Sequence, residues 1–187
     1  MLKDACRWYD WSMRKSTSGF TVVELLIVIV VIGVLAAITI VAYTTMQQKA
    51  RDAQRKQDVA TIVKALKMYE PDNGPMGSGS GCGAGGGGNG YFNYNYGSPG
   101  SDMNECLKAA KVISSTIADP QNTATCTTPG LTCRKYMKYT CTQSGALTTY
   151  VFANLETVGH TSTDTDGTCA PSVDTDYGMN YFVKVTS

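Results

Sequence analysis

One run of 23 residues, Phe20 to Ala42, is apolar almost throughout and carries a single charge, Glu24. As an α-helix it would measure about 34 Å, enough to span a hydrocarbon core of about 30 Å. A secretory signal peptide has a shorter apolar segment without an acid, and its small-residue cleavage site follows that segment. Here Gly19 and the basic pair Arg14–Lys15 precede the run. The run therefore predicts a membrane-spanning helix, and since a carboxylate is costly in lipid, Glu24 indicates a functional contact.

The residues around this acid read Lys15-Ser-Thr-Ser-Gly19 and then Phe20-Thr-Val-Val-Glu24-Leu-Leu-Ile-Val-Ile29. This pattern resembles the N-terminal (class III) signal of the type IV pilin and pseudopilin family. The resemblance implies that a membrane-embedded prepilin peptidase cleaves after Gly19 and N-methylates Phe20. It also implies that Glu24 pairs with the N-terminal amine of a neighbouring subunit, so that Phe20 and Glu24 form the assembly contact.

The resemblance also divides the chain into three parts. These are a prepilin leader, 1-19; a long N-terminal helix, 20-70, with its transmembrane segment at 20-42; and an extracytoplasmic globular head, 71-187. Met13 is an alternative start that would give a shorter leader, and the choice between Met1 and Met13 stays open.

The helical pattern continues beyond the apolar run, because the stretch from Ala50 to Glu70 contains neither proline nor glycine. An apolar stripe with helical spacing predicts a face that packs on another element; it consists of Val59, Ile62, Val63, Leu66 and Tyr69. The opposite face is predicted to be solvated, with pairing between subunits as the alternative; it carries Arg51, Asp52, Arg55, Lys56, Asp58, Lys64 and Lys67. Pro71 is predicted to end the helix, which then runs from Phe20 to Glu70 over about 75 Å.

The segment after this helix is predicted to be irregular. Asp72 to Pro75 forms a turn, and residues 77-90 form a loop rich in Gly and Ser, a flexible composition. This loop is not a phosphate-binding loop, because no Gly-Lys-Ser/Thr follows it. The aromatic cluster from Tyr91 to Tyr96 is predicted to lie in a loop, where it either packs over the sheet or binds a neighbour.

A second helix is predicted from Met103 to Ala118. Asp102 and Glu105 fit a capping box at its start, and Pro120 follows its end. One face of this helix is apolar and consists of Met103, Cys106, Leu107, Ala110, Ile113 and Ile117.

Three segments with an alternating pattern predict strands, 134-142, 147-156 and 179-185. Gly145 joins the first two as a hairpin, and the third returns after the loop 157-178. The apolar side chains expected on one face are Met137, Tyr139, Cys141, Leu147, Val151, Ala153, Leu155, Met179, Tyr181, Val183 and Val185. The predicted fold is α+β, with the long N-terminal α-helix packed on an antiparallel β-meander, 134-186, in the head.

Six of the seven cysteines follow the leader, and Cys6 lies within it. An even number of cysteines in an extracytoplasmic head predicts disulfides, each contributing about 2–4 kcal/mol. The predicted pairs are Cys126–Cys133, Cys141–Cys169 and Cys82–Cys106. A zinc site is disfavoured because the chain has no Cys-x2-Cys pair and only one histidine, His160, which is expected to be solvated.

Four aspartates flank Cys169 in the last long loop, namely Asp164, Asp166, Asp174 and Asp176. Spaced carboxylates near a glycine suit Ca²⁺, although the glutamate that ends an EF-hand loop is absent. The resemblance to major pseudopilins, which bind calcium in a comparable loop, implies a structural calcium; the alternative is an acidic, turn-forming loop. No other cofactor is expected. No catalytic arrangement is apparent, so the chain is not expected to be an enzyme.

The predicted function is that of a structural subunit, cleaved by prepilin peptidase and polymerised into a type IV pilus fibre for adhesion, motility or DNA uptake. The alternative is a pseudopilin of a type II secretion or competence machine. A third hypothesis, a singly anchored binding module, is disfavoured because a plain anchor gains nothing from Glu24.

The expected partners are further copies of the chain, prepilin peptidase, the inner-membrane pilus assembly platform and the membrane. A net charge of +1 gives no reason to expect a nucleic acid. Basic residues on both sides of the span leave its orientation open. The resemblance implies a single-pass protein of the cytoplasmic membrane with its N-terminus inside before assembly, and a cell-surface fibre afterwards.

Overall fold

The computed structural model describes residues 19–74, 90–92, 102–121, 134–143, 146–160, 173 and 177–185. The chain divides into two compact units, Met1–Tyr43 and Thr44–Ser187, and each unit is considered by itself. The predicted leader up to residue 18 and most of the Gly-rich loop 77-90 lie outside the described residues.

The long helix, α1, extends over Val22–Asn73, and its end differs from the prediction because Pro71 lies inside it. A proline removes one hydrogen bond and crowds the preceding turn, but its fixed φ is compatible with a helix. In this last turn the helix continues to Gly74, which has a φ of 77°. The Gly74 N–H donates to the Glu70 carbonyl at 2.9 Å, so the helix ends in a left-handed glycine cap.

The second helix, α2, begins as predicted but is shorter, covering Met103–Ala109 instead of reaching Ala118. Asp102 caps it by accepting a hydrogen bond from the Asn104 backbone N–H at 2.9 Å. The Asn104 side chain then bonds both the N–H and the carbonyl of Ile117, at 2.9 and 3.0 Å. The segment expected to be the second half of the helix therefore returns beside its first turn.

The early end of α2 is set by Lys111, whose φ of 58° lies in the left-handed region. The Lys111 N–H donates to the Lys108 carbonyl, and the Val112 N–H donates to the Leu107 carbonyl, both at 2.9 Å. These two bonds form a Schellman motif, which satisfies the last carbonyls of the helix. The next residues, from Val112 to Ile117, are β-branched residues and serines with low helix propensity, so nothing local favours continuing the helix.

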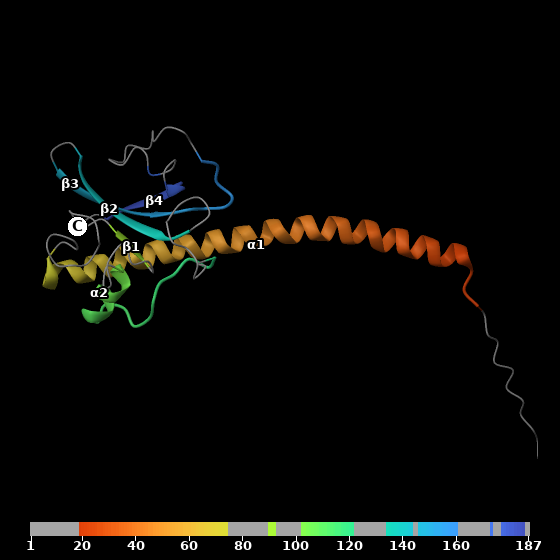
Figure 1. Cartoon of the computed structure of the whole chain (residues 1–187), viewed down its shortest axis with the longest axis horizontal. Helices are drawn as coiled ribbons and strands as arrows, with labels where there is room; N and C mark the ends of the chain where they lie inside the picture. Colours follow the sequence, from red (N-terminus) through yellow and green to blue (C-terminus); the bar gives the residue numbers. More distant parts are fainter. Residues whose placement is uncertain are drawn as a thin grey trace, which may run out of the picture. The chain divides into compact units, whose positions relative to one another are not determined.

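Four strands form one sheet in the order β1-β2-β3-β4, with every neighbouring pair antiparallel. They are β1 (Gly90–Phe92), β2 (Tyr136–Gln143), β3 (Ala146–Ala153) and β4 (Tyr181–Val185). Gln143 pairs with Ala146, which confirms the predicted hairpin. The sheet lies along the C-terminal part of α1 (Figure 1), and the predicted α+β meander is confirmed.

Strand β1 was not predicted, because Tyr91 and Phe92 were assigned to a loop. They pair instead with Met137 and Tyr136 of β2. Phe92 is fully buried on the helix side of the sheet, and Tyr91 lies in the cluster on the other side. Three residues give too little alternation for a strand to be recognised from sequence.

The main core lies between α1, α2 and one face of the sheet. Its buried members are Val59, Ile62, Ala65, Leu66, Tyr69, Phe92, Met103, Leu107, Tyr136, Val151, Ala153 and Val185. A second cluster, half of whose members are aromatic, occupies the other face; it consists of Tyr91, Met137, Tyr150, Phe152, Val173 and Met179. The stripe of α1 thus packs as predicted. Met137, Tyr139 and Met179 were assigned to the wrong face, because all three lie in or against this second cluster. Tyr136 takes the helix-facing position in β2, and Met179 precedes β4, with its N–H bonded to the Val173 carbonyl.

Candidate functional site

The first turn of α1 holds the acid that the sequence singled out. The Glu24 carboxylate accepts hydrogen bonds from the Thr21 backbone N–H and from Thr21 Oγ1, both at 2.8 Å. In return, the Glu24 N–H donates to Thr21 Oγ1 at 3.2 Å. This reciprocal arrangement is a capping box, in which a Thr-x-x-Glu sequence satisfies helix N–H groups that otherwise lack partners. The Thr-x-x-Glu spacing was visible in the sequence, but Thr21 was not identified as a partner of Glu24.

Gly19 and Phe20, the predicted cleavage position, are both exposed ahead of this turn. Phe20 is 83% exposed, and a Cβ added to Gly19 would meet no atom within 4 Å. The fold therefore leaves this peptide bond open to another protein, and a larger side chain at Gly19 would not disturb the described structure.

The part of α1 within the first unit has an apolar surface on all sides. Each large apolar side chain from Phe20 to Tyr43 is at least half exposed. Among the described residues, α1 is the one helix that is long and apolar enough to cross a membrane. Such a surface needs lipid or other apolar helices around it, because water would solvate it poorly.

Within the second unit, Arg55 of α1 is completely buried, contrary to the predicted solvated face. Its Nε and Nη2 donate to the two oxygens of Asp119 at 2.7 and 3.1 Å. Its Nη1 donates to Asp52 at 2.8 Å and to Glu156 at 2.7 Å, and Nη2 also donates to Gln121 at 3.0 Å. All five N–H donors of the guanidinium are therefore used.

Asp52 and Glu156 complete this cluster, which we call the Arg55 network and which consists of Arg51, Asp52, Arg55, Asp119 and Glu156. Asp52 also accepts from the backbone N–H groups of Glu156 and Thr157, each at 2.8 Å. Arg51 bonds both oxygens of Glu156, at 2.7 and 2.6 Å. The network therefore attaches α1 to the segment after α2 and to the segment after β3.

The network also shifts the pKa values of its carboxyl groups. Burial favours a higher pKa for Asp52, but the hydrogen bonds from Glu156 N–H and Thr157 outweigh it and hold that pKa below its usual value. The hydrogen bond from Arg51, helped by Arg55 and opposed by burial, lowers the pKa of Glu156 to about 2. Both groups are therefore charged in the folded head at neutral pH.

The prediction of a solvated face failed because the paired acids come from distant parts of the chain. One local signal did exist: Arg55 precedes Val59 by four residues and Ile62 by seven, which places it on the apolar stripe. Asp58 also has a partner within the fold, because its carboxylate accepts a hydrogen bond of 2.6 Å from the Tyr136 hydroxyl. Among the charged residues predicted on this face, Lys56 and Lys64 are exposed as expected.

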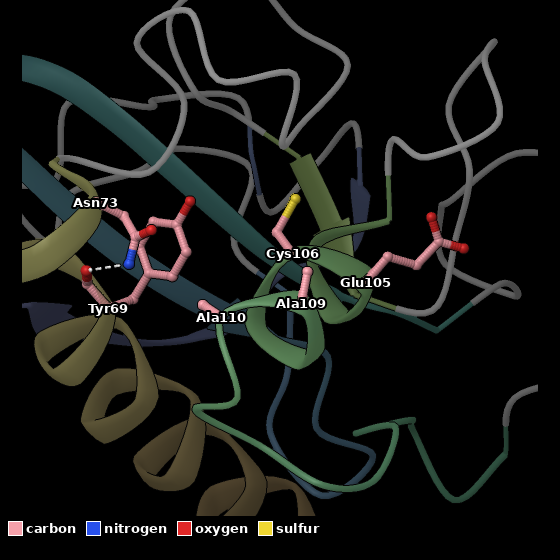
Figure 2. A pocket seen from close by; sticks show the side chains of 6 residues that line it. All are labelled: Tyr69, Asn73, Glu105, Cys106, Ala109 and Ala110. Carbon is pink, nitrogen blue, oxygen red and sulfur yellow. Dashed lines mark hydrogen bonds between the residues drawn. The ribbon is translucent and has the colours of Figure 1, made fainter.

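A pocket of about 410 Å³ lies between the last turn of α1 and α2, and Figure 2 shows its lining. It is lined by Tyr69, Asn73, Glu105, Cys106, Ala109 and Ala110. Cys106 is disulfide-bonded. Its predicted partner, Cys82, and the candidates Cys126, Cys133 and Cys169 lie outside the described residues, as does the side chain of Cys141. The pairings stay predictions.

The predicted calcium ligands Asp164, Asp166, Asp174 and Asp176 lie outside the described residues as well. Within the part of the chain that the structure describes, no group of His, Cys, Asp and Glu side chains could hold a metal ion. His160 is exposed, as expected.

Comparison with known proteins gives matches to part of the chain. Residues 14–40 match the family model of the prokaryotic N-terminal methylation motif. The chain is similar to proteins named type II secretion system core protein G, being 37% identical over 60 residues to that of Pseudomonas aeruginosa and 36% over 61 residues to that of Vibrio cholerae. It is 38% identical over 55 residues to that of Escherichia coli.

These three matches cover 32%, 33% and 29% of this chain. The chain spans less than half of the length of these relatives, namely 42%, 41% and 38%. No solved structure matches the chain significantly. The methylation motif and these matches, over about a third of the chain, confirm its predicted resemblance to the type IV pilin and pseudopilin family.

Proposed function

We propose that the chain is a pseudopilin-type structural subunit, which is cleaved after Gly19 and polymerises into the filament of a type II secretion-like machine. The observation that carries this proposal is the methylation motif with Glu24 in the first turn of an exposed apolar helix. The sequence alone favoured a long surface pilus, with a pseudopilin as the alternative. The relatives favour the second reading, because the three described above are named core protein G of type II secretion systems.

In this proposal, cleavage creates an α-amine on Phe20 that is four residues from Glu24. Both charges are poorly solvated in lipid, so pairing between subunits offsets part of the cost of burying them. Both hydrogen bonds from Thr21 go to one oxygen, Oε2 of Glu24. The other oxygen, Oε1, is then available for the amine of a neighbour, while Thr21 holds the carboxylate in place.

The chain is a structural subunit without catalytic activity, and its partners are further copies of itself, prepilin peptidase and the assembly platform of the inner membrane. Before assembly it is a single-pass protein of that membrane, with the head on the outer side. The head then forms the shell of the filament and the apolar part of α1 forms its core.

The test compares Glu24→Ala with wild type and with Val28→Ala, which removes an apolar side chain from the same helix. Removing an acid from the span makes insertion easier, so membrane-fraction levels of Glu24→Ala should equal or exceed those of wild type. The yield of sheared filament should fall at least tenfold for Glu24→Ala and stay near wild type for Val28→Ala. A normal filament yield from Glu24→Ala at equal membrane abundance would refute the assembly role.

A deletion of the gene separates the two family functions. A pseudopilin predicts loss of protein secretion into the medium, with twitching unaffected. Loss of surface fibres with normal secretion would instead support the pilus.

A further inference from the structure

Three lysines of α1, Lys49, Lys56 and Lys64, form an exposed ridge in the second unit. With 3.6 residues per turn they lie within an arc of about 80° on the helix surface. The exposed residues between them on this face are uncharged, namely Ala53, Gln57 and Ala60. Lys56 also lies over the ring of Tyr181, 5.7 Å from its centre.

The ridge is cationic because both acids of this stretch of α1 are engaged in contacts within the second unit. Asp52 is only 4% exposed and lies within the Arg55 network. Asp58 accepts the hydrogen bond from the Tyr136 hydroxyl. No exposed carboxylate therefore interrupts α1 from Lys49 to Lys64.

The pocket in Figure 2 has the opposite character. The Glu105 side chain extends along one edge of it, away from Tyr69 and Asn73 (Figure 2), and the small side chains of Ala109 and Ala110 lie beside it. Asp72, in the adjoining last turn of α1, is exposed. The C-terminal end of a helix carries a partial negative charge, and no basic residue lines the pocket.

We propose that this pocket accepts Lys64 from a second copy of the chain, an interface that rests on the proposed polymerisation. A lysine suits both chemistries of the pocket, because its methylene stem packs on apolar side chains while its ammonium group stays near water. The stem would lie against Ala109 and Ala110. The ammonium group would reach the Glu105 carboxylate, and the exposed Asp72 adds negative charge at the α1 end of the pocket.

The position of the pocket along α1 determines how far two neighbouring subunits are displaced from each other. Lys64 precedes Asp72 by eight residues, which is about 12 Å along a helix. A neighbour that enters the pocket is therefore displaced along α1 by about this distance. In a filament whose subunits are parallel, as proposed above, this contact between ridge and pocket is head-to-tail, and repeating it extends the filament.

The test uses charge reversal in the full chain, with the sheared-filament yield as the readout. Lys64→Glu alone and Glu105→Lys alone should each lower the yield at least fivefold at equal membrane-fraction abundance. The chain with both substitutions should recover to within twofold of wild type. The control is Lys184→Glu, which makes the same charge change on an exposed residue of β4 and should leave the yield unchanged.

The other outcomes overturn the proposal in distinguishable ways. Normal yields from both single variants, or single losses that the double variant does not repair, would reject the Lys64–pocket contact while leaving polymerisation intact. If Lys64→Glu lowers the amount of chain in the membrane fraction, and the filament yield falls by the same factor, the ridge binds anionic lipid and not the pocket. Wild-type protein that forms no filament would refute the proposed function itself, and this interface with it.

Discussion

Replacing Arg55 by methionine should destabilise the head strongly. Arg55 is fully buried, and its five N–H groups bond Asp52, Asp119, Glu156 and Gln121. Methionine has a similar length and keeps most of the packing, so the substitution mainly removes the charge and its hydrogen bonds. Three carboxylates are then left in a buried site without their common partner.

The size of the effect follows from this geometry. Removing one partner of a buried ion pair costs about 3–5 kcal/mol, because the remaining charge stays buried without compensation. The folded state of a typical domain is more stable than the unfolded state by about 5–15 kcal/mol. For a unit of this size, we expect the melting temperature to fall by about 10 °C or more.

The assay is urea and thermal unfolding of the full chain in detergent micelles, followed by near-ultraviolet circular dichroism of the tyrosines in the head. Lys64→Met is the matched control, because it removes a cation from an exposed position of the same helix and should change the free energy of unfolding by about 0.5 kcal/mol or less. If Arg55→Met is no more damaging than Lys64→Met, the network does not stabilise the head, and the reasoning is wrong.

Two further predictions concern pH. The pKa of Glu156 is about 2 in the folded head, against an ordinary value of 4.5. The stabilisation that the charged Glu156 provides is therefore complete above about pH 4.5 and is lost as the pH falls towards 2. Glu156→Gln should make the free energy of unfolding depend less on pH in that window. An unchanged pH dependence of the free energy of unfolding, measured by urea titrations, would contradict this. Burial lowers the pKa of Lys138 to about 8 from 10.5, against the opposing charge of Glu70. The unfolded chain then binds the proton more tightly, so stability should rise from pH 8 towards 10.5, by at most about 1.4 kcal/mol per pH unit. Lys138→Met should remove this rise and Lys64→Met should keep it; identical slopes in the two variants would rule out Lys138 as the source.

Local periodicity was sufficient to predict the elements that make up most of the fold. The stripe from Val59 to Tyr69 has the spacing of one helix face, and strands β2, β3 and β4 have the alternation of a sheet. Features that depend on single residues were missed. The end of α2 depends on a left-handed Lys111, which no propensity favours for a lysine. The continuation of α1 through Pro71 depends on its place in the last turn.

The candidate functional site likewise has a part that could be predicted from the sequence and a part that could not. Gly19, Phe20 and Glu24 were identified because their signal is a contiguous pattern in the sequence. The Arg55 network could not be predicted, because Asp119 is 64 residues from Arg55 and Glu156 is 101 residues away. Only the folded chain brings these groups together. A buried arginine is stable there because each of its donors has a partner.

The most direct test of the central claim is the intact mass and N-terminal peptide of the subunit recovered from sheared filaments. We expect a chain that begins at Phe20, carries one methyl group on its α-amine and lacks residues 1–19. Gly19→Val should remain uncleaved in the membrane fraction, since its new side chain meets nothing in the fold and can act only at the peptidase. Filaments built from chains that retain the leader, or that begin at another residue, would contradict the account.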